Sequence, residues 1–181
     1  MRRSVDEKLR IELFNPSHSD DLFKLIQANR DHFGEWLEFP YHTHTVNDAS
    51  AFIAGTIQKQ AAGNGGWCGI WLEDQLVGAI GFVHINRMDQ TTEIGYYLAQ
   101  EYEGQGIISR CCREIIKYVF EELGLHRIEI RVHPDNTRSR NIPERLGFVQ
   151  EGILRQAEWF VDRYMDKVIY GLLKEEWNPG L

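Results

Sequence analysis

The stretch from Thr92 to Gly124 constrains the possible folds of this chain more than any other. In its first part apolar residues alternate with other residues, which predicts a strand. From Ile107 to Leu123 the apolar residues recur at helical spacing, which predicts an amphipathic helix. Gly124 follows where a helix stop is expected. The chain therefore contains a strand that leads almost directly into a long helix.

Two glycines lie between this strand and this helix, in the sequence Gly104-Gln105-Gly106. The first turn of a helix has unpaired backbone N–H groups and the positive end of the helix dipole, so it attracts anions. Glycines allow a bulky anion to come close to the main chain. The pattern indicates a pyrophosphate-binding loop made of backbone, although two glycines alone are also typical of a tight turn.

Outside this stretch the sequence predicts further strands and helices. Strands are expected over residues 8–14, 67–72, 76–85, 127–133, 148–160 and 164–173, and helices over 20–29, from Thr45 or Asn47 to about 61, and from Asn136 or Thr137 to 146. Residues 30–41 fit neither pattern. The strand over 127–133 follows a helical crossover, so we expect it to lie parallel to the strand that begins at Thr92.

Length and composition narrow the class of protein. At 181 residues the chain suits a single domain, expected over residues 1–181. A net charge of −7 disfavours a nucleic-acid binder and fits a cationic partner such as an amine. No apolar run is long enough for a membrane span, and the charged N-terminus does not resemble a signal peptide. We therefore expect neither a nucleic-acid nor a membrane partner.

Cysteine and histidine usage bears on the compartment and on metals. Cys68, Cys111 and Cys112 form an odd set with two adjacent members on the predicted helix stripe. They indicate buried thiols in a reducing compartment, so a cytoplasmic location is expected. His42 and His44 have a spacing that some metal ligands share, but they lack the further partners of a metal-site pattern, so no metal is expected.

The order of these motifs resembles a known family. Strand, Gly-x-Gly, helix, strand, Asn136-x-x-Ser139, helix and Leu-Gly-Phe follow one another as in the GCN5-related N-acetyltransferase (GNAT) superfamily, whose members bind acetyl-CoA. In detail the chain is similar to the RimJ/RimL branch, which acetylates protein N-termini, ribosomal ones among them. The resemblance covers nearly the whole chain and is carried by the stretches EIGYYLAQEYEGQGI, RIEIRVHPDNTRSRNIPERLGF, EGILRQAEW and DKVIYGLL.

This resemblance implies an α+β fold. A central, mostly antiparallel twisted sheet of about seven strands would be flanked by about four helices. Its two parallel strands, beginning at Thr92 and Arg127, would splay apart and let the pantetheine arm lie between them like an additional strand. One position departs from the superfamily, because Glu101 stands where Arg or Gln usually precedes the first glycine. The RimL-like branch relaxes this position, so acetyl-CoA remains the expected co-substrate.

The resemblance also implies which residues hold acetyl-CoA. Backbone groups of the first strand would hold pantetheine, with an N–H near Leu98 polarising the thioester carbonyl. The glycine loop would hold the pyrophosphate through its N–H groups. The implied cofactor-binding residues are Tyr97, Leu98, Ala99, Gly104, Gln105, Gly106, Ile107, Ser109 and Asn136.

Three residues are candidates for proton transfer. Glu158 is the first candidate for the base that deprotonates the amine, because the RimL-like pattern has a glutamate there, and Glu93 is the second. Either could instead be an exposed carboxylate paired with an arginine. Ser139 matches the position at which that branch has a proton donor for the leaving thiol, and it could equally be a first-turn serine that satisfies local backbone.

Several functions stay open at this level. An N-terminal α-amino group, such as that of a ribosomal protein, is the favoured acceptor, because its pKa of about 7.7–8.0 is well below the value of about 10.4 for lysine. The alternative is a small amine, such as a polyamine, an amino sugar, an antibiotic or an amino-acid conjugate. Acceptor choice is expected to depend on loops such as residues 30–45. By resemblance a homodimer is possible.

Other classes fit less well. A dinucleotide-binding oxidoreductase is disfavoured because the glycines follow an antiparallel meander in mid-chain and Ser109 replaces the third glycine. The sequence G-x-x-x-x-G-K-[ST] of P-loop enzymes does not occur. A non-catalytic module that binds or senses CoA remains an alternative of another class.

Overall fold

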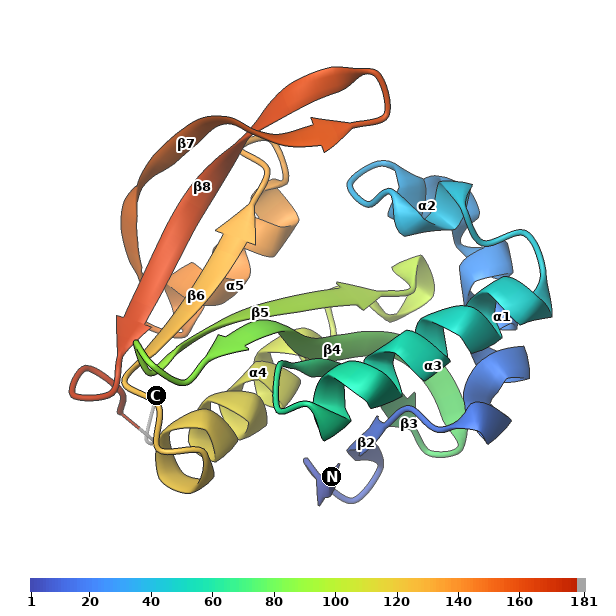
Figure 1. Ribbon diagram of the computed structural model, residues 1–181, viewed down its shortest axis with the longest axis horizontal. Coiled ribbons are helices and arrows are strands. Elements are labelled where there is room, and N and C mark those ends of the chain that lie inside the picture. Colours follow the sequence, from blue (N-terminus) through green and yellow to red (C-terminus); the bar gives the residue numbers. More distant parts are fainter. Residues whose placement is uncertain (179–181) are drawn as a thin grey trace.

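The computed structural model describes residues 1–178 and contains one eight-stranded sheet with helices on both faces (Figure 1). The strands are β1 (Arg2–Ser4), β2 (Leu9–Leu13), β3 (Gly66–Leu72), β4 (Gln75–Asn86), β5 (Thr91–Leu98), β6 (Arg127–Val132), β7 (Val149–Phe160) and β8 (Arg163–Leu173). The α-helices are α1 (Ser19–Ala28), α2 (Arg30–Gly34), α3 (Val46–Ala61), α4 (Ile107–Lys117) and α5 (Thr137–Arg145). The mixed, mostly antiparallel sheet expected from the sequence is confirmed.

The strands follow the order β1-β2-β3-β4-β5-β6-β8-β7, and every neighbouring pair except one is antiparallel. The exception is β5 and β6, which run parallel as the helical crossover predicted. They pair only between residues 91–93 and 127–129. Beyond that point β5 stays with β4, and β6 stays with β8. Figure 1 shows the two groups of strands diverging from there, an arrangement that we call the splay.

Two apolar clusters hold the helices against the sheet. The first joins α4 to β2–β6 and β8, with fully buried members such as Ile115 and Phe120. The second joins α1, α2 and α3 to the other face, around residues such as Phe33 and Trp71. Alternate residues of β5 therefore face different clusters, with Leu98 in the first and Tyr97 in the second. Each face of β5 thus meets its own set of helices.

Helix α4 begins and ends as the glycines predicted, but it is shorter than its apolar stripe. Gly106 is its N-cap with φ +71°, and Gly124 ends the segment with φ +66°. The α-helix stops at Lys117, and one π-helical turn over Tyr118–Glu122 continues it. The expected single helix to Leu123 is therefore corrected. A π turn keeps apolar residues on the buried side, so the sequence pattern did not reveal it.

The two elements beyond the expected number are short. β1 has three residues and pairs with β2 ahead of the predicted first strand. The unassigned residues 30–41 contain the five-residue α2 and a 3₁₀ turn over Phe39–Tyr41. Of the two cap candidates for α3, Thr45 is the cap and exchanges hydrogen bonds with Asp48.

Two expectations from the sequence concern the state of the cysteines and the presence of a membrane-spanning helix. Cys68, Cys111 and Cys112 are free and buried, as their positions on apolar faces predicted. Burial raises the pKa of the Cys68 and Cys111 thiols to about 12. Within residues 1–178 no helix is long and apolar enough to cross a membrane.

Candidate active site

The splay leaves one edge of β5 without a neighbouring strand. The Ala99 N–H donates to the Val77 carbonyl at 2.8 Å, on the β4 side. Successive N–H groups of a strand point to opposite edges, so the Leu98 N–H points away from β4 and toward β6. A donor for the carbonyl of a thioester that lies in the splay would have to point in this direction. Tyr97, Leu98 and Ala99 are buried, so their side chains wall the splay from both faces.

The glycine loop follows the end of β5 and provides free N–H groups. Gly104 and Gly106 have φ +74° and +71°, and a Cβ added to either would meet nothing within 4 Å. The N–H groups of Gly104, Gln105 and Gly106 donate to no acceptor within residues 1–178. Gly106 caps α4 without a side-chain hydrogen bond, so the first turn, which includes Ser109, keeps unpaired donors. These donors and this open space fit a pyrophosphate.

Asn136 and Ser139 lie across the splay, at the start of α5. The Asn136 side-chain oxygen accepts the Ser139 N–H at 3.0 Å, so Asn136 is the helix cap. Its side-chain amide nitrogen has no partner among residues 1–178, so it can donate to a pantetheine amide. Both sequence-derived roles of Asn136, as cap and as CoA ligand, are therefore compatible.

Tyr96 joins Ser139 because of a proline. In a regular helix the N–H of residue 143 would donate to the carbonyl of residue 139, but Pro143 has none. The Tyr96 hydroxyl donates to the Ser139 carbonyl instead, at 3.0 Å, and lies 3.3 Å from the Ser139 hydroxyl. Burial raises the pKa of Tyr96 well above its ordinary value, which keeps the phenol protonated. Two hydroxyl groups thus lie together on the α5 side of the splay.

Glu158 lies on β7 in a cluster with His133 and Lys167. Its Oε2 atom is 2.8 Å from His133 Nε2 and 2.6 Å from Lys167 Nζ. Neither contact has the angles of a well-formed hydrogen bond, so both are close charge contacts. Burial alone would raise the pKa of Glu158, but the approach of His133 and Lys167 outweighs burial and lowers that pKa. The carboxylate is therefore ionised near neutral pH.

Aromatic rings enclose this cluster. The His133 ring is 3% exposed and lies between Trp36, at a centroid distance of 5.9 Å, and Phe160, at 5.6 Å. Trp36 belongs to the segment after α2, which also contacts the β7–β8 turn, where the Val161 N–H donates to Glu38 at 3.3 Å. Segments far apart in the sequence therefore close over one end of the splay.

Arg30 supports the same segment from within. Its guanidinium donates to the carbonyls of Pro40 and Thr43. These contacts fix the turn that follows Trp36. The side chain of Arg30 is thus engaged in the fold of residues 30–43.

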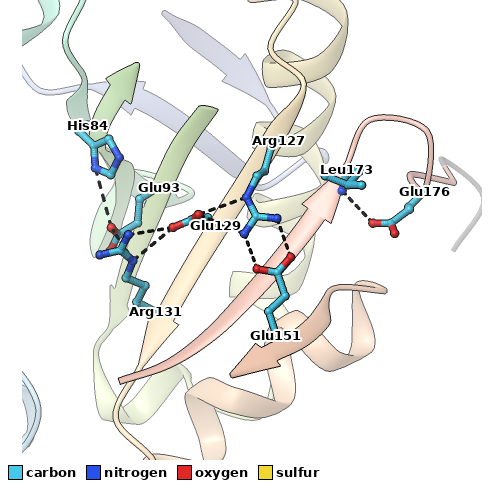
Figure 2. Close-up of polar contacts among 8 residues, drawn as sticks. All are labelled: His84, Glu93, Arg127, Glu129, Arg131, Glu151, Leu173 and Glu176. Atoms are coloured by element: carbon cyan, nitrogen blue, oxygen red, sulfur yellow. Dashed lines mark hydrogen bonds and ion pairs between the residues drawn. The ribbon is translucent and has the colours of Figure 1, made fainter. Parts of the chain in front are cut away.

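Glu93 lies at the closed end of the splay, in another cluster (Figure 2). Its carboxylate is 3.4 Å from Arg131 and 3.8 Å from His84, and Arg131 also contacts Glu129 at 2.9 Å. Burial is the largest influence on Glu93 and raises its pKa despite Arg131. The strand rise of about 3.3 Å per residue separates Glu93 from Leu98 by roughly 16 Å. Glu93 thus forms its ion pairs with His84 and Arg131, although the positive charge of Lys167, which contacts Glu158, also acts to lower its pKa.

Sequence reasoning missed three members of this site. His133, Lys167 and Tyr96 contact the predicted residues Glu158 and Ser139 but were not assigned roles. His133 continues the alternation of polar residues along β6. A polar residue at such a position is expected to be exposed, but His133 is buried, and this burial sets it apart. Within residues 1–178 no group of three or more histidine, cysteine or acidic side chains could hold a metal.

The glycine loop yields a testable expectation. Gly106→Ala is expected to weaken acetyl-CoA binding about 10–100-fold, because the added methyl group enters the space of the phosphates and disturbs charge-assisted hydrogen bonds. Alanine at this positive φ should also cost about 1–2 kcal/mol of folding free energy. Calorimetric titration and thermal unfolding measure both effects.

Gly124→Ala is the matched control at the other end of the same segment. Its φ of +66° imposes similar strain, and its Cβ also meets nothing within 4 Å. We expect it to lower stability by a similar amount and to leave the acetyl-CoA affinity unchanged. Equal affinity in both variants would contradict the assignment of the loop.

Known acetyltransferases are similar to this chain in sequence. A family model described as an acetyltransferase (GNAT) domain matches residues 8–149. The putative ribosomal N-acetyltransferase YdaF of Bacillus subtilis is 36% identical over 175 residues, 96% of each chain. The ribosomal-protein-serine acetyltransferase of Escherichia coli is 32% identical over 92% of this chain and 93% of that protein.

Solved structures of acetyltransferases are similar to this chain in fold. A probable acetyltransferase that is 35% identical superposes with a TM-score of 0.90 and covers 98% of this chain and 99% of its own. RimL, a ribosomal L7/L12 α-N-protein acetyltransferase in complex with coenzyme A, reaches a TM-score of 0.92 at 23% identity, over 96% of this chain and 98% of its own. The second likeness concerns the fold alone.

Proposed function

The chain belongs to the GNAT family of acetyltransferases, and from this membership we propose that it acetylates the N-terminal α-amino group of a protein, such as a ribosomal protein. The observation that carries the proposal is the splay, with the glycine loop after β5 and the Glu158 cluster beyond β6 at its open end. The names of the 36% and 32% identical relatives favour a ribosomal acceptor.

Each side of the splay has a distinct task in this proposal. Acetyl-CoA supplies an activated acyl carbon and a thiol leaving group. The Gly104–Gly106 loop holds the pyrophosphate, and the Asn136 amide holds the pantetheine arm. The Leu98 N–H polarises the carbonyl. The Ser139 hydroxyl donates a proton to the leaving sulfur from the α5 side, and the cluster of Glu158 receives the proton of the amine from the opposite face.

The two faces follow from strand alternation. Tyr96 and Leu98 face the cluster of α4, whereas Tyr97 faces the cluster of α2. The polar residues of β6 lie on the second face, because Ile130 and Val132 face α4. A proton donor and a proton acceptor on opposite faces cannot neutralise one another. Glu93 remains the second candidate base, at the closed end.

Two further features belong to the proposal. We propose that residues 1–181 form one acetyltransferase domain, which the match over 8–149 and the coverage of 96% of YdaF support. The homodimer implied by resemblance stays a prediction.

A panel of acceptors tests the proposed function. Free thiol release from acetyl-CoA would be followed with peptides that carry a free N-terminus, with the same peptides N-acetylated, and with small amines such as polyamines and amino sugars. We expect turnover with the free peptides, and its loss when the N-terminus is blocked, because the blocked peptide has no attacking α-amine.

Other outcomes reassign or reject the function. Turnover with small amines alone would overturn the peptide acceptor and keep the acetyltransferase chemistry. Tight binding of acetyl-CoA without turnover of any amine would favour a sensing module. A peptide whose only free amine is a lysine side chain is the matched control, and it should react far more slowly at neutral pH because lysine has a pKa of about 10.4.

A further inference from the structure

His133 has an unsatisfied polar atom that the proposed mechanism does not yet use. The ring is 3% exposed, and its Nε2 atom lies 2.8 Å from Glu158 Oε2. Both ring nitrogens are buried and without a well-formed hydrogen bond within residues 1–178, but Nε2 has the Glu158 carboxylate as a charge contact whereas Nδ1 has no such contact. Leaving a buried polar atom unpaired costs about 1–3 kcal/mol. Such an atom needs an explanation, and a catalytic role is one that fits a site of this kind.

We propose that His133 is the base that takes the proton from the acceptor amine, and that Glu158 orients its ring. The inference rests on the proposed function, acetylation of an amine. In this arrangement Nε2–H faces the Glu158 carboxylate, which leaves the lone pair of Nδ1 for the amine. A carboxylate that fixes the tautomer of a histidine base and stabilises the imidazolium is a known catalytic arrangement.

The strand register places His133 at the level where the reaction is expected. Glu93 pairs with Glu129 in the parallel register of β5 and β6. If that register is continued for four residues along both strands, His133 lies level with Tyr97, one residue before Leu98. The two strands have diverged by then, which leaves room for an extended molecule between them. His133 therefore faces the position of the acyl group more directly than Glu93 does.

Ordinary acidities favour an imidazole over the carboxylate as the base. A glutamate has a pKa of about 4.3 and an α-amino group one of about 7.7–8.0, so direct transfer to glutamate is uphill by more than about three pK units. The pKa of Glu158 is lowered further by His133 and Lys167. Histidine side chains in general titrate near 6.5, which is much closer to the amine.

The charged groups at His133 come from two strands. Glu158 approaches from β7, and Lys167 from β8 contacts the same Glu158 oxygen atom at 2.6 Å. The α2 side contributes the uncharged ring of Trp36. Lys167 offsets part of the carboxylate charge and holds it in place, so Glu158 stays an anion and does not itself become the proton carrier.

The proton balance of the step closes without another reactant. The α-ammonium gives one proton to His133 Nδ1 and becomes a neutral amine. The nitrogen lone pair forms the C–N bond with the acyl carbon, and the electrons of the C–S bond leave with sulfur. The second amine proton ends on sulfur, by way of Ser139, and the His133 proton passes to solvent. The products are an amide, a thiol and one released proton.

Substitution of His133 tests the inference through turnover and binding. His133→Gln is expected to lower kcat about 10²–10⁴-fold, with the acetyl-CoA affinity unchanged by calorimetry and the acid limb of the pH profile of kcat/KM set by the amine alone, near its pKa of about 7.7–8.0. His133→Gly should recover turnover when imidazole is added. His126→Gln, the same change at an exposed histidine just before β6, is the control and should keep full turnover.

Nitrogen NMR of the free enzyme gives a readout that needs no turnover. In the wild type we expect His133 to be the Nε2–H tautomer, with Nδ1 unprotonated. In Glu158→Gln we expect the ratio of the two tautomers to change. An Nδ1–H tautomer in the wild type, or full turnover of folded His133→Gln, would overturn the role of His133. Peptide turnover by the wild type would uphold the proposed function in either case. An inactive wild type would instead reject the function, and the tautomer would still decide whether Glu158 orients His133.

Discussion

Glu158→Gln is expected to lower kcat about 10²–10⁴-fold and to leave the dissociation constant of acetyl-CoA nearly unchanged. Glutamine has almost the same shape as glutamate, but it cannot hold the Nε2–H of His133 with a full negative charge or stabilise the imidazolium. Glu158 lies beyond β6, whereas the glycine loop follows β5, so CoA binding is not disturbed. Steady-state kinetics and calorimetric titration separate the two effects.

Glu151→Gln is the matched control for this experiment. Glu151 is also on β7 and also forms an ion pair, with Arg127 (Figure 2), but it lies near the start of the strand whereas Glu158 lies near its end. Burial of Glu151 is slight, and hydrogen bonding from Arg127 lowers its pKa. We expect its substitution to change turnover little. Equal losses in both variants would mean that any carboxylate on β7 matters through the fold alone, which would refute a specific role for Glu158.

Phe120→Ala is expected to destabilise the protein by about 3–5 kcal/mol, because the substitution removes a buried ring and leaves a cavity. Phe120 is 1% exposed in the π turn after α4 and lies 5.7 Å from the Trp177 ring. For a chain of this size each kcal/mol lowers the melting temperature by about 2–4 °C. We therefore expect a fall of roughly 10 °C in calorimetry.

Met88→Ala provides the comparison for that loss. Met88 is 92% exposed, so its truncation should change stability by less than about 0.5 kcal/mol. The folded fraction of Phe120→Ala at low temperature should still bind acetyl-CoA, because the glycine loop lies at the opposite end of the segment. A loss of stability no larger than that of Met88→Ala would show that the cluster relaxes to fill the cavity.

Periodicity predicted the parts of the fold that are regular and long. The strand, loop and helix around Gly104 and Gly106 were found because both patterns extend over several residues. β1 was missed because three residues carry no measurable period. The segment 30–41 was unassigned because its helix has only one turn and its aromatic residues are held by tertiary contacts, such as Trp36 with His133.

The site was predictable to a different extent. Glu158 and Ser139 were proposed through resemblance, since neither has a distinctive pattern around it, and their roles stay predictions. His133 was missed because the alternation of β6 marks it only as one more polar strand residue, while its burial and its contact with Glu158 on β7 are visible only in the fold. The contact between Tyr96 and Ser139 follows from the N–H that Pro143 lacks. The sequence predicts that this proline limits the helix. It does not predict that the Ser139 carbonyl, left without a donor, accepts a hydrogen bond from Tyr96 on β5.

The splay also affects how this sheet meets other polypeptides. Beyond Glu93 and Glu129 the facing edges of β5 and β6 carry backbone donors and acceptors with no adjacent strand. Unpaired edges are the places where foreign strands attach, in β-augmentation and in aggregation. Here such edges lie inside the sheet, where a second folded molecule cannot approach, and strands pair at a spacing of about 5 Å. Only a thin, extended molecule can use them. The proposed cleft for a pantetheine arm would therefore also protect the chain against self-association at these unpaired backbone edges.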